Sequence, residues 1–189
     1  MKKIRGIFIA ALLVSTTAIF AQEVKVNVEK SNIEWLGKKV GGQHDGSIEL
    51  KNGSFMLKGD QIVSGSFVVD MTSIINYDLT NETMNQKLVD HLKSDDFFGV
   101  EKYPTATFVV TESTPFKDGK AMLTGDITIK ENTERITFEV MRDGDKFMTT
   151  LKLDRSKFDV RYGSKTFFAN IGDRAIDDIF KLDINFVVE

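Results

Sequence analysis

Few side chains in this sequence are suited to acid–base or nucleophilic chemistry, and they are scattered. The 189 residues include two histidines, His44 and His91, and no cysteine. Without cysteine, disulfides and thiol catalysis are excluded, and two distant histidines lack the spacing of a zinc site. We therefore expect no metal centre and no cofactor. The acidic group Asp173, Asp177 and Asp178 is interpreted as a solvated face.

His91 and Arg155 are the two polar residues that could serve a ligand site. His91 could orient a polar head group or act as a base, but a histidine on an apolar helical stripe is more often structural. Arg155 could hold a phosphate or carboxylate with paired N–H donors, or it could pair with an acid at the rim of the fold. The sequence contains no nucleophile elbow, phosphate loop or dinucleotide motif. We therefore expect no enzymatic activity, and an enzyme acting on a lipid head group ranks last among the functions considered.

Alternation of apolar and polar residues predicts the elements that must position these side chains. In the segment 105–112, for example, Ala106, Phe108 and Val110 share one face. Such alternation is typical of antiparallel strands with one buried face. We expect strands at 33–39, 47–50, 61–70, 105–112, 121–129, 135–141, 146–153 and 180–188. Asn-Gly, Gly-Asp and Asp-Gly pairs predict turns at 51–53, 58–60, 117–119 and 142–145.

One segment, 83–93, has a helical pattern instead. Thr83 and Gln86 have the spacing of a capping box, and Met84, Leu88 and Leu92 form one stripe that also includes His91. This short amphipathic helix either covers the mouth of a cavity or simply packs against the sheet. A weaker helical turn is expected within 171–178.

The pattern indicates an all-β fold of about eight antiparallel strands with one helix. Closing such a sheet into a barrel removes its edges and leaves an interior that can hold a small ligand. A β-sandwich is the competing architecture, and alternation alone does not separate the two.

The N-terminus has the layout of a secretory signal peptide. Lys2, Lys3 and Arg5 precede a short apolar run that ends before Ala21. We expect cleavage after residue 21, which leaves 22–189 as one domain in the periplasm or outside the cell; the alternative is an uncleaved anchor. Removing three cations changes the formal charge from −3 to −6, which disfavours nucleic acid and anionic membranes as partners. No stable membrane insertion is expected after cleavage, and a homodimer is left open.

A longer ordered pattern resembles the YceI family. It comprises Trp35 and the segments 65–67, 70–74, 88–98, 103–108, 124–130 and 153–158, of which 88–98 reads LVDHLKSDDFF and 103–108 reads YPTATF. The similarity extends from about residue 28 to residue 188. It implies a lipocalin-like antiparallel barrel that is exported and holds a long amphiphile, such as a polyisoprenoid, in an internal cavity. The segments 40–46, 130–134 and 162–170 depart from the family pattern.

The resemblance implies a lipid site lined by aromatic and apolar residues, and the fifteen phenylalanines of the chain agree with it. For any single phenylalanine, the alternative is an ordinary core position. The candidate lipid-binding residues are Trp35, Phe67, Met84, Leu88, His91, Phe97, Phe98, Phe108, Phe138, Arg155, Phe158, Phe167 and Phe168. The expected ligand is an amphiphilic lipid that the protein sequesters or carries. The alternative function is an exported interaction module with a filled core and no small-molecule ligand.

Overall fold

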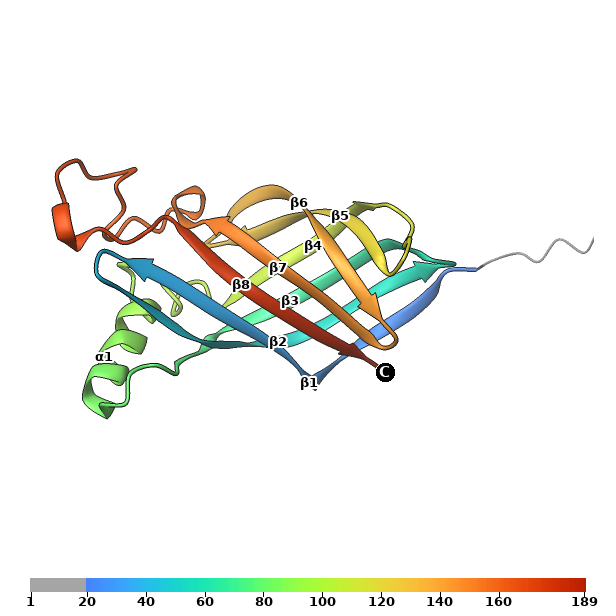
Figure 1. Cartoon of the computed structure of the whole chain (residues 1–189), viewed down its shortest axis with the longest axis horizontal. Helices are drawn as coiled ribbons and strands as arrows, with labels where there is room; N and C mark the ends of the chain where they lie inside the picture. Colours follow the sequence, from blue (N-terminus) through green and yellow to red (C-terminus); the bar gives the residue numbers. More distant parts are fainter. Residues whose placement is uncertain (1–19) are drawn as a thin grey trace, which may run out of the picture.

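The alternating segments form eight antiparallel strands that close into a barrel, as the computed structural model of residues 20–189 shows (Figure 1). The strands follow one another in chain order, and β8 pairs with β1 to close the wall. The elements are β1 Gln22–Lys39, β2 Gly42–Lys58, β3 Gln61–Asn76, α1 Glu82–Lys93, β4 Thr105–Ser113, β5 Lys120–Ile129, β6 Asn132–Asp143, β7 Lys146–Asp154, the 3-10 turns η1 Arg155–Phe158 and η2 Gly172–Arg174, and β8 Ile179–Val188. The predicted all-β barrel with one short helix is confirmed, and the sandwich is excluded. The expected signal peptide, 1–21, lies outside the described residues except for Phe20 and Ala21.

The predicted inward faces are confirmed where alternation was clear. On β4, Ala106 and Val110 are buried and Phe108 points to the interior, while Val109 between them is 46% exposed. This is the result expected when one face of each strand is withdrawn from water and the other is solvated. The core is therefore the inside of the barrel.

The first three strands are longer than predicted: β1 begins at Gln22, β2 extends from Gly42 to Lys58, and β3 continues to Asn76. The expected turn at 51–53 is wrong: β2 passes through it with a bulge between Leu50 and Asn52. A bulge accommodates the extra residue without ending the strand. The predicted turns at 58–60, 117–119 and 142–145 are confirmed, and Gly59 and Gly144 supply the positive φ angles, both 60°.

The two ends of the barrel differ. At one end lie the β1–β2 turn, α1, the β5–β6 turn and the long β7–β8 connection; at the other lie three hairpin turns and both described termini (Figure 1). β6 and β7 pair at only three positions beside their hairpin and then diverge. Beyond the ladder, the Thr149 hydroxyl donates to the Glu139 carbonyl at 2.7 Å and replaces a backbone bond.

α1 differs from its predicted pattern in its cap and its buried face. Asn81, rather than Thr83, caps the helix by accepting a hydrogen bond from the Met84 amide at 3.0 Å. The buried residue is Val89, whereas Met84 is 53% exposed. Because the helix packs beside β3, tertiary contact selects the face that contains Val89 and Leu92. Of the weak helical turn expected within 171–178, only η2 forms. No helix among residues 20–189 is long and apolar enough to cross a membrane.

Candidate ligand cavity

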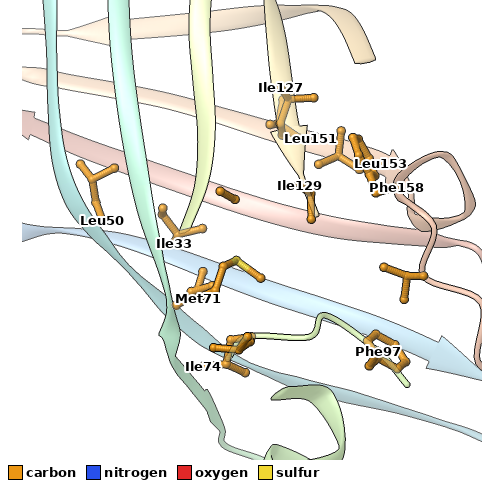
Figure 2. Packing of buried hydrophobic residues seen from close by; sticks show 14 of the residues in the cluster. Ile33, Leu50, Met71, Ile74, Phe97, Ile127, Ile129, Leu151, Leu153 and Phe158 are labelled. Atoms are coloured by element: carbon orange, nitrogen blue, oxygen red, sulfur yellow. The ribbon is translucent and has the colours of Figure 1, made fainter. Parts of the chain in front are cut away.

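The barrel encloses a cavity of about 220 Å3. Nearly all of the side chains that line it are apolar, and they come from all eight strands, from α1 and from the segment that follows α1. Figure 2 shows part of the buried cluster around this interior: Leu50, Met71 and Leu151 project from strands of the wall, and Phe97 enters from the segment after α1. Burying apolar ligand surface in such a space is worth about 25 cal/mol per Å2.

An aromatic row lines the middle of the cavity. Phe67 stacks on Phe186, with ring centroids 5.5 Å apart and planes 16° apart, and lies 6.2 Å from Phe108. Phe108 in turn lies 5.5 Å from Phe138. Offset aromatic contacts of this kind hold large apolar side chains in fixed positions. The row therefore gives the cavity a rigid apolar wall.

Two glycines make room for these rings. A Cβ atom on Gly125 would lie 2.4 Å from both Cζ of Phe108 and the carbonyl oxygen of Val109. One on Gly46 would lie 1.9 Å from the carbonyl oxygen of Ile75 and 2.7 Å from Cζ2 of Trp35. Trp35 and Gly46 are direct partners across β1 and β2. At both positions any other residue would displace the ring or the neighbouring strand, so glycine allows the ring and the backbone to approach each other closely.

The structure brings together seven of the thirteen candidate residues at the cavity. These are Trp35, Phe67, Phe97, Phe98, Phe108, Phe138 and Arg155. Six of them are aromatic and come from β1, β3, β4, β6 and the segment after α1. They are placed for contact with a ligand, and their part in binding stays a prediction.

The other six candidates do not line the cavity. Met84 is exposed on α1 and Leu88 is half-buried there. Phe158 is 1% exposed and belongs to the packed core, which is the ordinary role considered for any single phenylalanine. Phe167 and Phe168 are 39% and 48% exposed on the β7–β8 connection.

The sixth, His91, belongs to α1, and its side chain packs against the β7–β8 connection. Its ring meets Tyr162 edge to face at 4.3 Å and Phe97 at 5.9 Å. Its Nε2 is buried without a hydrogen-bond partner among the described residues. This packing matches the structural role considered for His91 more closely than that of a base facing a substrate.

Arg155 lines one end of the cavity but is 2% exposed, and its donors are already engaged. Nε donates to the Asp177 carbonyl at 3.0 Å, Nη1 donates to those of Val160 and Tyr162 at 3.1 and 2.8 Å, and Nη2 donates to that of Ile176 at 3.1 Å. Four of the five N–H groups of the guanidinium are thus used by backbone carbonyls. Little donor capacity is left for a head group.

An acid completes the arrangement around Arg155. Oδ1 of Asp178 lies 3.2 Å from Nη2, an ion pair without hydrogen-bond geometry. Burial tends to raise the pKa of Asp178, but hydrogen bonds from Ser164 and Thr166 and the charge of Arg155 outweigh it and hold the pKa below its ordinary value. This geometry is the second role considered for Arg155, pairing with an acid at the rim. The pair fastens the β7–β8 connection to the barrel.

Lys130, in the β5–β6 turn, also holds segments together at this end of the barrel. Its Nζ donates to the carbonyls of Phe97 and Asp159, both at 3.0 Å. Burial lowers the pKa of the Lys130 amine, and nearby Asp159 offsets part of that effect. Lys130 therefore connects the segment after α1 with the segment after η1.

The candidate list omitted lining residues on β8. Leu182, Ile184 and Phe186 all line the cavity. Their alternation had already placed them on an inward face, so the signal was available, but it did not separate cavity positions from core positions. Exposed Asp177 also belongs to the lining, beside Ile176. The cavity lining therefore extends to the end of the barrel where the β7–β8 connection lies.

Comparison with known proteins agrees with this architecture. A family model described as a YceI-like domain matches residues 24–188. Protein YceI of Escherichia coli O157:H7 is 29% identical over 150 residues, which are 73% of this chain and 71% of that protein. Protein YceI of Salmonella newport (strain SL254) is 29% identical over 158 residues, which are 76% of this chain and 75% of that one.

Two solved structures share the fold. BcnA of Burkholderia cenocepacia has a TM-score of 0.65 at 23% identity and covers 87% of this chain and 99% of its own. A polyisoprenoid binding domain of Saccharophagus degradans, implicated in plant cell wall breakdown, has a TM-score of 0.59 at 13% identity. The match covers 88% of this chain and 97% of that domain. At these identities the likeness concerns the fold alone. The family model spans almost the entire barrel, and the chain therefore belongs to the YceI-like domain family.

Proposed function

We propose that this protein binds an amphiphilic lipid whose apolar chain occupies the barrel cavity, and that it sequesters or carries this lipid outside the cytoplasm. The observation that supports the proposal best is the apolar cavity of about 220 Å3 itself. An open apolar interior is unfavourable unless something covers it, because its lining loses van der Waals contacts or faces water. A filled interaction module would not need one.

The ligand class follows from the shape and chemistry of the lining. Rings and branched aliphatic side chains offer dispersion contacts but few directional bonds, so they suit a hydrocarbon chain. A polyisoprenoid, a prenylated quinone and a fatty-acid derivative all meet this description. The polyisoprenoid binding domain with the same fold supports the first of these. The predicted signal peptide supports a periplasmic or secreted location.

Native mass spectrometry of the exported protein, followed by analysis of an organic extract, tests the proposal. We expect a bound lipid of defined mass at one per chain or per dimer. A protein that is empty on purification and also takes up no prenyl or acyl lipid would refute it.

A matched pair of variants on β4 locates the ligand. Ala106 lines the cavity, whereas Val109 on the opposite face is 46% exposed. Ala106→Phe should lower the affinity for a chain-bearing probe by about tenfold or more, equal to about 1.4 kcal/mol of lost contact. Val109→Phe should leave the affinity unchanged. If Ala106→Phe fails to fold, Leu182→Phe adds bulk at a half-buried lining position on β8.

A further inference from the structure

The β7–β8 connection carries an exposed aromatic surface at the cavity end of the barrel. Tyr162, Phe167 and Phe168, here called the aromatic tip, are 48%, 39% and 48% exposed. Figure 1 shows the connection projecting past the ends of the strands, at the same end as α1. Clustered exposed aromatic rings are uncommon on the surface of a soluble domain and mark an interaction surface.

The aromatic tip is held outward by defined bonds. Ser164, at its centre, is fully buried, and its carbonyl accepts hydrogen bonds from the amides of Phe167 and Phe168 at 3.3 and 3.0 Å. The Thr166 hydroxyl donates to Oδ2 of Asp178 at 2.7 Å. Since Asp178 in turn pairs with buried Arg155, the rings are presented to solvent by a fastened turn.

The charge around the aromatic tip has the opposite sign to that of the protein. The whole connection, residues 155–178, contains five cations and four anions, a net +1, and three of the cations, Arg161, Lys165 and Arg174, are close to the aromatic tip in sequence. By contrast, residues 22–189 carry 22 cations and 28 anions, a net −6. Lys165 and Arg174 make no ion pair within the described part of the chain.

The cation of Arg161 lies beside one of the rings of the aromatic tip. Its guanidinium lies 5.1 Å from the centre of the Phe167 ring and pairs with Asp159. Aromatic rings beside cations are the composition that sits at the level of lipid head groups, where rings enter the interface and cations meet anionic lipids. The aromatic tip is complementary in both apolarity and charge to an anionic bilayer surface.

The aromatic tip also belongs to the connection that supplies two residues of the cavity lining. Ile176 and Asp177, which line the cavity, follow η2 in this connection, and the Ile176 amide donates to the carbonyl of Gly163, next to Tyr162, at 2.8 Å. A bilayer in contact with the aromatic tip would therefore lie at the end of the barrel where the cavity lining reaches this connection.

We propose that the aromatic tip docks the barrel reversibly on an anionic membrane, with this end toward the bilayer, so that a lipid can pass between bilayer and cavity. This docking rests on the proposed lipid-binding function for its purpose but not for its geometry. The contact is peripheral: two rings and a few cations enter the interface, and no segment inserts across it.

Vesicle flotation of the mature protein tests the docking. Vesicles of phosphatidylcholine with 30% phosphatidylglycerol are compared with pure phosphatidylcholine, at low and high salt. Phe167→Ala/Phe168→Ala should weaken partitioning into the anionic vesicles by about tenfold or more, because both rings lose interfacial burial. Val63→Ala/Val109→Ala, at exposed apolar positions on the barrel wall, should bind as the wild type does.

The charged residues have a separate signature. Lys165→Gln/Arg174→Gln should lower binding to anionic vesicles and remove most of its salt dependence, while binding to pure phosphatidylcholine stays unchanged. The docking is refuted if the wild type shows no preference for anionic vesicles or if Phe167→Ala/Phe168→Ala binds them like the wild type. It is also refuted if Val63→Ala/Val109→Ala loses as much vesicle binding as Phe167→Ala/Phe168→Ala does. If the aromatic rings bind only a partner protein, Phe167→Ala/Phe168→Ala should bind vesicles like the wild type.

Native mass spectrometry of the same samples separates the two proposals. If the wild type retains a lipid but does not bind vesicles, docking fails and the lipid-binding function stands. If it binds vesicles through the aromatic tip but never holds or takes up a lipid, docking stands and the function fails.

Discussion

Replacing Arg155 by methionine should destabilise the protein by about 3–4 kcal/mol, the lower part of the range for removing one partner of a buried ion pair. Methionine preserves the apolar stem and much of the contact with Phe97, whose ring centre lies 5.4 Å from the guanidinium carbon. It removes four hydrogen bonds to carbonyls and leaves Asp178 without its cation. Because Asp177 and Tyr162 are exposed, water satisfies part of the loss, which selects the lower part of the range.

Urea denaturation measures this loss directly. The midpoint should fall with little change in slope, since the fold and its buried surface persist. In thermal melts the same change corresponds to a lowering of Tm by about 6–16 °C for a domain of this size. Hydrogen exchange should accelerate first in residues 159–178, which the guanidinium fastens to the barrel.

Arg135 provides the matched control. It pairs with Asp126 at 2.9 Å, but its side chain is 60% exposed. Arg135→Met should therefore cost less than about 1 kcal/mol, the usual limit for a surface ion pair. The role assigned to Arg155 in holding this connection is wrong if the free energy of unfolding of Arg155→Met lies within about 1 kcal/mol of that of the wild type. It is also wrong if Arg155→Met and Arg135→Met are equally stable.

Three further outcomes are expected. Glu131→Gly should stabilise the protein by about 0.5–1 kcal/mol in urea melts, because Glu131 occupies a left-handed conformation at φ 61° that disfavours side chains; a loss of stability would contradict this. Because the pKa of Asp178 is lower in the folded protein than its unfolded value of 3.8, its charge stabilises the fold fully above pH 3.8, and this stability is lost as the pH falls through the folded pKa. In Asp178→Asn the urea midpoint should therefore fall less steeply with pH below 3.8 than in the wild type. An unchanged dependence on pH would contradict this role of Asp178. Gly125→Val should cost about 2–3 kcal/mol and push Phe108 into the cavity, displacing ligand. Gly42→Ala is the control: it lies outside the cavity lining, its added Cβ meets only Cε of Lys39 at 3.7 Å, and it should change neither Tm nor ligand retention.

Alternation alone determined much of the fold. The inward faces of β4, β6, β7 and β8 follow from period-two patterns, because a sheet with one dry face must place its apolar residues on that face. Hairpin turns were predictable where Gly-Asp or Asp-Gly supplies positive φ. The segment 51–53 shows the limit: Asn-Gly has the local chemistry of a turn, but pairing with β3 carries β2 through it as a bulge.

The site depended on information that local patterns lack. Phe108 and Phe158 are both buried or half-buried aromatic residues, yet one lines the cavity and the other fills the core, because closure of the barrel decides which ring meets open space. Phe167 and Phe168 follow the family pattern only loosely, and the fastened β7–β8 connection turns them outward. Their sequence neighbours do not encode this direction.

The polar residues of the chain show most clearly what the sequence determined and what the tertiary structure decided. From the sequence alone, thiol chemistry was excluded, and Arg155 was a donor without an assigned partner. Tertiary structure surrounds that donor with four carbonyls and Asp178, drawn from residues 160–178. The sequence determined which groups exist and which strand faces are apolar, since those depend on residue type and period. The closed barrel decided which groups meet, because its contacts join residues far apart in the chain.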